Sequence, residues 1–348
     1  MKKKIVAISL VILFTAALLA GCGTASAETL YVYNWGVFMD TSVLAEFESE
    51  YNCKVVYENY ASNEEMYYKI KGGNAVYDVI FPSDYMIEKM VEEDLLLPLN
   101  YDNIPNYANI DERTLNKDFD PANVYSVPYF WGTLGIIYNT NYVEEEITSW
   151  NALFDEKYQG QILMYDSQRD SMAVALSLLG YSINSTNESE LEEAYNLLVE
   201  QKPLVMAYVN DQVIDMMIGS EAHLAVVYSG DGVYCMSMNE SLKYVVPQEG
   251  SNYWFDNMAI PASCENQELA EAFINFMCRD DIAIRNTMEV GYSSSNKAAM
   301  AAALEEEEFN NEAYNPTDEI LARCSVFRNL GDEYVQKYAD YWTRVKAH

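Results

Sequence analysis

Residues 252–257 read Asn-Tyr-Trp-Phe-Asp-Asn, so three aromatic side chains lead directly into a carboxylate. In an extended segment, side chains alternate between two faces, which puts Trp254 and Asp256 on one face and Tyr253 and Phe255 on the other. An indole beside an anion suits an organic ammonium, because the ring face attracts the cation and the carboxylate accepts its N–H bonds. The alternative is a core strand whose aspartate caps the next turn.

Strand and helix patterns alternate through the first third of the chain. The strands, rich in β-branched and aromatic residues, are expected near 29–33, 54–57 and 77–81, and a helix pattern follows each of them. This order predicts a parallel sheet with right-handed crossovers. Because ligands of such sheets bind beyond the carboxyl ends of the strands, Trp35 and Tyr85 should converge there.

A second set of alternating strands and helices spans residues 149–231, with strand patterns near 161–164, 204–208 and 223–228. An extended apolar run at 125–138 separates the two sets, and the 252–257 stretch follows the second. The sequence therefore predicts two α/β units whose chain crosses between them more than once.

Composition supports a globular protein of 348 residues, with 50% hydrophobic and 22% charged residues. The formal net charge is −33, and removal of residues 1–21, which hold three Lys and no acid, changes it to −33 − 3 = −36. This balance excludes nucleic acid as a partner and favours cationic ligands, although solubility alone would explain it equally well.

The N-terminus has the pattern of an export signal. Three Lys precede the apolar run 5–20, and the sequence Leu-Ala-Gly-Cys that ends at Cys22 resembles the bacterial lipoprotein box. The resemblance implies cleavage of residues 1–21, lipidation of Cys22 and a tether over 22–28, which would hold the protein outside the cytoplasm on the cell membrane. A plain secretory signal is the alternative.

The sequence gives little support for a metal site or a cofactor, and we expect neither. Besides Cys22 there are five Cys without C-x-x-C spacing, which we expect to be mostly buried free thiols. His223 and His348 are the two histidines, so a Ser-His-Asp triad or a His-rich metal site is hard to build and we expect no enzyme.

Several motifs, taken in order, resemble those of bacterial spermidine/putrescine-binding proteins, the extracytoplasmic receptors of polyamine ABC transporters. They are Tyr33-Asn34-Trp35, Pro82-Ser83-x-Tyr85, Pro128-Tyr129-x-Trp131-Gly132, Trp254-x-Asp256 and Gly291-Tyr292. The resemblance covers essentially the whole mature chain. It implies an α/β, two-lobed type II periplasmic-binding-protein fold with crossing hinge strands. Lobe 1 would comprise residues 29–133 plus 257–302, and lobe 2 residues 138–252 plus 303–348.

The resemblance also implies the aromatic walls of a polyamine site. Four side chains look like the walls that sandwich the methylene chain: Trp35, Tyr85, Trp254 and Tyr292. Phe38 stands where the family often has Tyr, and Tyr228 where it often has Trp.

Three acids and two serines complete the implied site. Asp256 looks like the main ammonium acceptor, Asp170 like the acid that grips an amine from lobe 2, and Asp231 like an acid of the putrescine-preferring members. Ser83 and Ser167 would hydrogen-bond the ligand, and Ser167 replaces an Asp found in some spermidine-binding members.

The resemblance implies a receptor that closes its two lobes around a cationic polyamine and delivers it to a membrane-embedded ABC permease. We expect a monomer, anchored through Cys22, with no catalytic residue. Thiamine or another organic cation in the same fold remains an alternative. So do an extracellular carbohydrate-active enzyme with paired carboxylates and a structural surface lipoprotein. The sequence leaves the preference between spermidine and putrescine open. Arg328 stands near the sequence position at which the family has a Gln that reaches the ligand.

Overall fold

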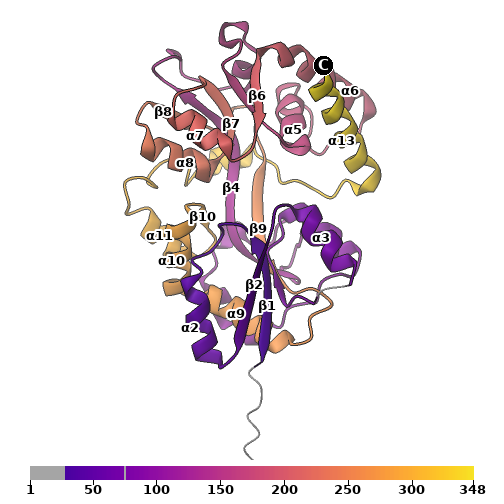
Figure 1. The fold of residues 1–348 in the computed structure, drawn as a ribbon, viewed down its shortest axis with the longest axis vertical. Helices are drawn as coiled ribbons and strands as arrows, with labels where there is room; N and C mark the ends of the chain where they lie inside the picture. Colours follow the sequence, from indigo (N-terminus) through magenta and orange to yellow (C-terminus); the bar gives the residue numbers. More distant parts are fainter. Residues whose placement is uncertain (1–27, 74–75) are drawn as a thin grey trace, which may run out of the picture.

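The computed structural model describes residues 28–73 and 76–348, and it forms two lobes, one above the other in Figure 1. The predictions for the signal peptide, the lipidation of Cys22 and nearly all of the tether lie outside these residues. Two long strands run between the lobes: β4 (Ser126–Asn139) and β9 (Tyr253–Ala259).

Lobe 1 opens with the predicted alternation of strands and helices. Its three strands are parallel and lie in the order β2-β1-β3, which confirms the predicted parallel unit. In chain order the elements are β1 (Thr29–Trp35), α2 (Ser42–Tyr51), β2 (Lys54–Tyr60), α3 (Asn63–Lys71), β3 (Val79–Ile80) and α4 (Asp84–Glu92).

Strand β4 belongs to both lobes. Its first half pairs with β9 and with β10 (Ser293–Ser294), and its second half pairs with β7 (Leu224–Tyr228) and β8 (Leu242–Val245), always antiparallel. All 14 residues of β4 are buried, which explains the unbroken apolar run in the sequence. The predicted crossing of this segment is confirmed.

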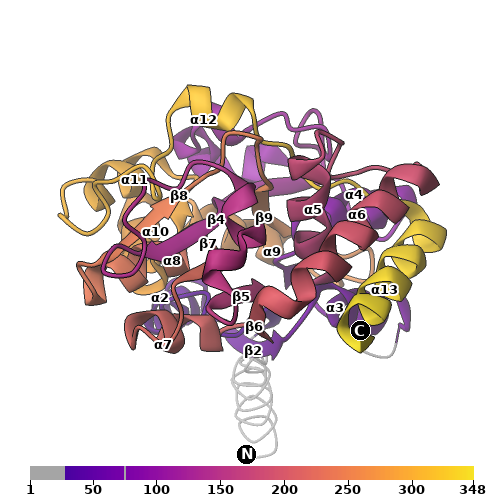
Figure 2. The same cartoon turned by 90° about the horizontal axis from the view of Figure 1, so that it is seen from above.

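Lobe 2 holds the second parallel unit, with β7, β5 and β6 as neighbours. Figure 2 shows α5, α6 and α13 on one side of the strands and α7 and α8 on the other. The bounds are β5 (Ile162–Tyr165), α5 (Gln168–Leu178), α6 (Glu188–Gln201), β6 (Val205–Val209), α7 (Gln212–Ile218), α8 (Ser229–Met238) and α13 (Gly331–Ala347).

The remaining helices are short or lie in lobe 1. They are α9 (Gln267–Met277), α10 (Asp280–Val290), α11 (Lys297–Ala303) and α12 (Asp318–Ala322). Short 3-10 helices occur at Tyr101–Asn103, Pro105–Asn109, Glu112–Thr114, Trp150–Phe154, Glu156–Tyr158 and Lys202–Leu204.

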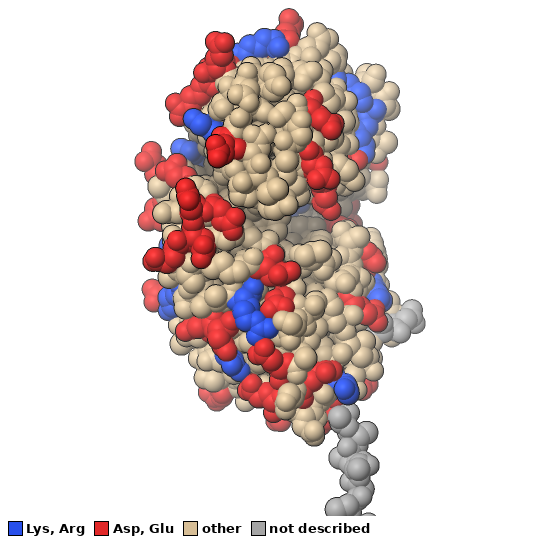
Figure 3. Space-filling model, turned by 60° about the vertical axis from the view of Figure 1, so that its left-hand side comes forward, with Lys and Arg blue, Asp and Glu red and all other residues tan. Residues whose placement is uncertain are grey.

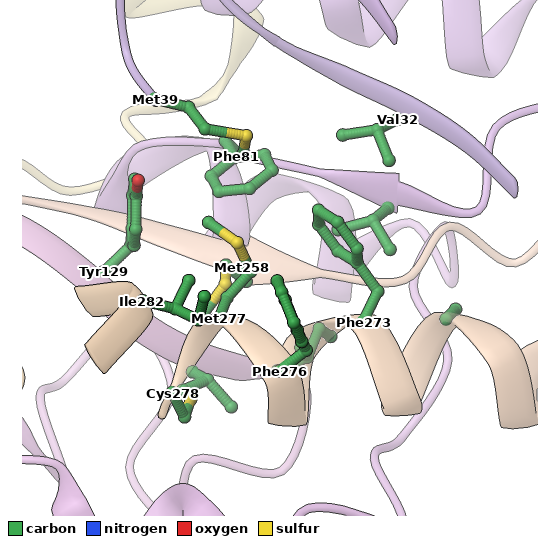
Figure 4. Packing of buried hydrophobic residues seen from close by; sticks show 14 of the residues in the cluster. Val32, Met39, Phe81, Tyr129, Met258, Phe273, Phe276, Met277, Cys278 and Ile282 are labelled. Atoms are coloured by element: carbon green, nitrogen blue, oxygen red, sulfur yellow. The ribbon is translucent and has the colours of Figure 1, made fainter. Parts of the chain in front are cut away.

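Each lobe buries a core of its own, and a waist separates the lobes on the face shown in Figure 3. In lobe 1, α9 directs Phe273, Phe276 and Met277 toward Val32 and Phe81, and all five are 0–1% exposed (Figure 4). Burial of this apolar area stabilises lobe 1.

A third crossing joins the lobes behind β9. Ser325 forms a parallel bridge with Asn252, the Ser325 N–H donates to the Ser251 carbonyl and the Tyr253 N–H donates to the Ser325 carbonyl, each at 2.9 Å. Upstream of it, Phe309 and Tyr314 pack in the same apolar cluster as Met300. Three chain crossings therefore form the hinge.

Within 28–73 and 76–348, no helix has the length and apolarity to cross a membrane, and no cluster of side chains could hold a metal ion. The five cysteines of this part are free, and Cys53, Cys235 and Cys278 are buried, which confirms the expectation of mostly buried thiols.

Gly250→Ala is expected to lower the free energy of unfolding by about 2–4 kcal/mol, measured by urea denaturation. Gly250 has φ +91°, and a Cβ there would lie 2.0 Å from the carbonyl oxygen of Arg323, at the hinge. Gly160→Ala is the matched control, because Gly160 has φ +71° and open space around it. That variant should lose only about 1 kcal/mol, and equal losses in both would contradict a clash at the crossing.

Candidate functional site

The alternation predicted for residues 253–256 is confirmed. Trp254 lies edge-to-face against Tyr228, with ring centroids 5.9 Å apart, and against Tyr292 at 5.1 Å. Tyr253 and Phe255 point to the opposite side and pack in another apolar cluster. Since Tyr228 comes from β7 in lobe 2, the indole of β9 faces the junction of the two lobes.

Asp256 follows on the same face and is 7% exposed. Its Oδ1 accepts a hydrogen bond of 2.6 Å from the hydroxyl of Ser83, which in turn accepts one of 2.9 Å from the Asn63 amide. Burial raises the pKa of Asp256 to about 7, because a charged carboxylate is poorly solvated there. A cation bound beside Asp256 would restore the charged form.

Asp170 is the second buried acid and lies in the first turn of α5, 4% exposed. Ser167 caps this helix, and its hydroxyl accepts the Asp170 N–H at 3.3 Å. The Tyr228 hydroxyl donates to Asp170 Oδ2 at 3.0 Å, whereas Oδ1 is buried without a hydrogen-bond partner. Burial raises the pKa of Asp170 as well. An orphaned carboxylate oxygen is costly, so this atom calls for a donor that a ligand could supply.

Asp231 lies in the first turn of α8 and takes part in a contact between the lobes. The hydroxyl of Tyr292, which follows α10 in lobe 1, donates to Asp231 Oδ1 at 3.0 Å. Burial raises the pKa of Asp231 to about 6. Gly230 presents its backbone to the Tyr292 ring, since a Cβ at Gly230 would lie 2.1 Å from that ring.

The predicted aromatic residues form a chain of rings across the site. Centroid distances are 6.5 Å from Trp35 to Phe38, 6.1 Å from Phe38 to Tyr292 and 5.1 Å from Tyr292 to Trp254, with Tyr228 next. The Trp254 Nε1 is buried without a hydrogen-bond partner.

Tyr85 lies at another edge of the site and reaches it through Asn63. The Asn63 amide donates to the Tyr85 hydroxyl at 3.2 Å, and that hydroxyl donates to Glu64 at 3.0 Å. Because the same amide also donates to Ser83, Asn63 links Tyr85 to the partner of Asp256.

Two residues that lie beside the candidate site were not expected from the sequence, which also left the role of Arg328 open. Asn63 begins α3 and is 5% exposed, but no local pattern marks it as a site residue. Tyr165 lies 5.0 Å from the Tyr228 ring, and its position at the end of a strand could have identified it. Arg328 turns to Glu88, with Nε 3.0 Å from both carboxylate oxygens, and contributes to the hinge.

Gly230→Ala is expected to weaken ligand affinity by about 1–3 kcal/mol, or roughly 5- to 150-fold, because the new methyl group would push the Tyr292 ring and lobe 1 away from α8. Fluorescence titration of the tryptophans would measure it. Gly36→Ala is the control, since no atom lies within 4 Å of a Cβ at that position. Equal affinities for both variants would contradict close packing of the lobes at Gly230.

Known proteins are similar to this chain over most of its length. Residues 42–316 match the family described as bacterial extracellular solute-binding protein. The spermidine/putrescine-binding periplasmic protein of Salmonella typhimurium is 35% identical over 341 residues, 97% of each chain.

Two solved structures share the fold over nearly their whole length. The spermidine/putrescine ABC transporter substrate-binding protein PotD of Streptococcus pneumoniae has a TM-score of 0.83 and 41% identity, covering 92% of this chain and 99% of that one. The TpPotD lipoprotein of Treponema pallidum has a TM-score of 0.80 and 29% identity, covering 91% and 99%. The predicted two-lobed periplasmic-binding-protein fold is confirmed.

Proposed function

Because the chain belongs to the bacterial extracellular solute-binding proteins, we propose that it is the extracytoplasmic receptor of an ABC importer and binds a polyamine, spermidine or putrescine, between its lobes. One observation carries this proposal: two buried carboxylates, Asp256 on β9 and Asp170 on α5, face the junction from different lobes, with aromatic rings beside them. Two anions flanking an apolar wall suit a ligand with a cation at each end of a methylene chain.

The energetics favour such a ligand. Burial of the methylene groups contributes about 0.8 kcal/mol each, contacts between an ammonium and the aromatic rings about 0.5–2 kcal/mol, and hydrogen bonds to a carboxylate about 1.5–3 kcal/mol. Immobilising the flexible ligand opposes these gains. Burial disfavours the ionised form of both acids, and an ammonium group beside each of them restores it. A dication that reaches both acids therefore stabilises the closed arrangement more than the open one.

The proposed site has three kinds of side chain. Trp35, Phe38, Tyr85, Tyr228, Trp254 and Tyr292 are the walls, Asp170, Asp231 and Asp256 the ammonium acceptors, and Ser83 and Ser167 the further hydrogen-bonding groups. The hydrogen bonds from Ser83 and Tyr228 keep one oxygen of Asp256 and one of Asp170 in place and leave the others for the ligand.

We propose the lobes as residues 29–133 plus 257–302 and residues 138–252 plus the C-terminal tail, for which we expected 303–348. The separate apolar cores support this division. The packing of Phe309 and Tyr314 beside Met300 favours counting the tail as lobe 2 only after the crossing at Ser325.

The anchor and the partners are also proposals. We propose that Cys22 carries lipid, that the protein acts as a monomer and not as an enzyme, and that its closed form is recognised by a membrane permease. The lipoprotein box supports the anchor, and a relative from Treponema pallidum is a lipoprotein.

A thermal-shift panel tests the ligand class. Spermidine or putrescine should raise the melting temperature of protein freed of co-purified amine, because a ligand that binds only the folded state stabilises it by mass action. Thiamine, lysine and cellobiose serve as comparison ligands. A shift with thiamine alone would favour the organic-cation alternative, a shift with cellobiose alone would favour the carbohydrate-active one, and either would contradict the polyamine assignment.

A further inference from the structure

Arg169 is a buried cation beside the site that the proposed binding chemistry does not use. It is the second residue of α5 and is 9% exposed. Its guanidinium donates to two neutral oxygens, Asn184 Oδ1 at 2.9 Å and the Arg328 carbonyl at 3.3 Å, while its Nε is buried without a partner. No carboxylate of the described residues forms an ion pair with this guanidinium, and Asp170 and Asp84 act on its charge only from a longer distance. Its burial therefore costs stability and needs an explanation.

Three aromatic rings surround this guanidinium, and they come from three parts of the molecule. The distances to the ring centroids are 4.3 Å for Phe327, 5.4 Å for Tyr338 and 5.9 Å for Tyr85. Phe327 belongs to the third crossing, Tyr338 to α13 of lobe 2 and Tyr85 to α4 of lobe 1. Tyr85 also packs against the small cluster formed by Ala173, Ile183 and Phe327, so the contact with lobe 1 has an apolar component as well.

The crossing segment 326–328 is bonded to both lobes. On lobe 2, the Asn184 amide donates to the Val326 carbonyl at 2.8 Å, and its Oδ1 accepts both the Arg169 guanidinium and the Arg328 N–H at 2.9 Å. On lobe 1, the Arg328 guanidinium binds Glu88 of α4. Arg169 therefore sits where lobe 1, lobe 2 and the crossing segment meet.

We propose that Arg169 is a positioning residue that sets the relative orientation of the two lobes, and through it the separation of Asp170 from Asp256. It does so by holding the Tyr85 ring and segment 326–328 in contact with the N-terminal turn of α5. The consequence for ligand affinity rests on the proposed function. The consequence for lobe orientation does not, because it is measured on protein that has been freed of ligand.

The sequence position of Arg169 links it to the site. Asp170 is the next residue, so any shift of the α5 N-terminus relative to α4 moves the orphaned Asp170 oxygen as well. A residue that served only the stability of lobe 2 would change the free energy of unfolding but would leave the distance between the lobes unchanged.

The test is the distance between lobes in the full protein, measured by double electron–electron resonance. A spin label on a keto amino acid replaces Tyr68 of lobe 1, which is 68% exposed, and another replaces Tyr142 of lobe 2, which is 51% exposed. In the empty protein, Arg169→Met should give a longer and broader distance distribution than the parent, and Arg169→Lys should give an intermediate one.

Arg344→Met is the matched control. Arg344 stacks on Tyr195 at 4.1 Å and on Tyr341 at 5.3 Å, both within lobe 2, so its loss removes the same kind of contact away from the hinge. Its distance distribution should equal that of the parent. If Arg169→Met does not fold, Tyr85→Leu removes the lobe 1 side of the contact and should lengthen the distance in the same way.

A distribution unchanged in Arg169→Met, or in Tyr85→Leu if the first variant does not fold, would overturn the proposal. Putrescine titration is the second readout, and Arg169→Met should bind at least about tenfold more weakly than Arg344→Met, a coupling of ordinary size. If the parent protein binds no polyamine, the proposed function fails, while the distance comparison in the empty protein still decides the role of Arg169.

Discussion

Asp256→Asn is expected to weaken polyamine affinity by about 2–5 kcal/mol, or about 30-fold to several thousand-fold. The carboxylate is 7% exposed and keeps the hydrogen bond from Ser83, so the variant preserves the shape of the site and removes only its charge. An ammonium that enters would give up its hydration without gaining a counterion. Calorimetric titration of both proteins with spermidine and putrescine measures the loss.

Asp102→Asn is the control, because Asp102 is an exposed acid of lobe 1 and its loss changes the net charge of the protein by the same amount. Its affinity should stay close to that of the parent. If Asp256→Asn also bound the amines as tightly as the parent, Asp256 could not be the main ammonium acceptor.

The same substitution should stabilise the empty protein at pH 8. The pKa of Asp256 is raised to about 7 in the folded state. Between pH 4 and 7 the folded protein therefore holds a proton that the unfolded chain has released, and stability falls as the pH rises through this range. The total is of the order of 4 kcal/mol from the shift in pKa. Urea denaturation of the parent should show a lower free energy of unfolding at pH 8 than at pH 5. In Asp256→Asn the part of this difference that comes from residue 256 should be absent.

Polyamine affinity should fall by about tenfold for each pH unit below 7, reaching about 100-fold at pH 5. The ligand binds the ionised Asp256, whereas in the empty site burial raises the pKa of this acid to about 7, so binding at lower pH must expel a proton. Aliphatic amines remain charged throughout this range, so the protein causes the change. Asp231, whose pKa is raised to about 6, would steepen the fall below pH 6.

Titrations at pH 8, 7, 6 and 5, each in two buffers of different ionisation enthalpy, measure both the affinity and the proton released. Asp256→Asn should bind weakly at every pH and should release little of the proton. An affinity that stays constant from pH 8 to pH 5 in the parent would show that Asp256 is already ionised in the empty site.

Much of the architecture could be predicted because its strands and helices produce repeating patterns of apolar residues along the sequence. The parallel unit of lobe 1, the fully buried β4 and the alternation of Trp254 with Phe255 each leave a repeating pattern of apolar residues. The crossing at Ser325 leaves none, since it is a single bridge to Asn252 rather than a strand. An isolated contact between residues far apart in the sequence, outside a regular pair of strands, gives no repeating pattern of apolar residues.

The side chains of the site show the same limit. The direction of Asp256 follows from its strand, so its place beside Trp254 was predictable. The guanidinium of Arg169 reaches the hinge, but its partners Phe327 and Asn184 depend on how distant segments pack. Asn63 is similar, because only the folded chain brings it to Ser83 and Tyr85.

The polyamine site between the lobes is tested by calorimetric titration with putrescine and with spermidine at pH 8. The parent protein is first unfolded and refolded to remove bound amine. We expect saturable binding of one amine molecule per chain for at least one of the two ligands. No heat of binding with either amine, on protein that has regained its fold, would contradict a polyamine site between the lobes.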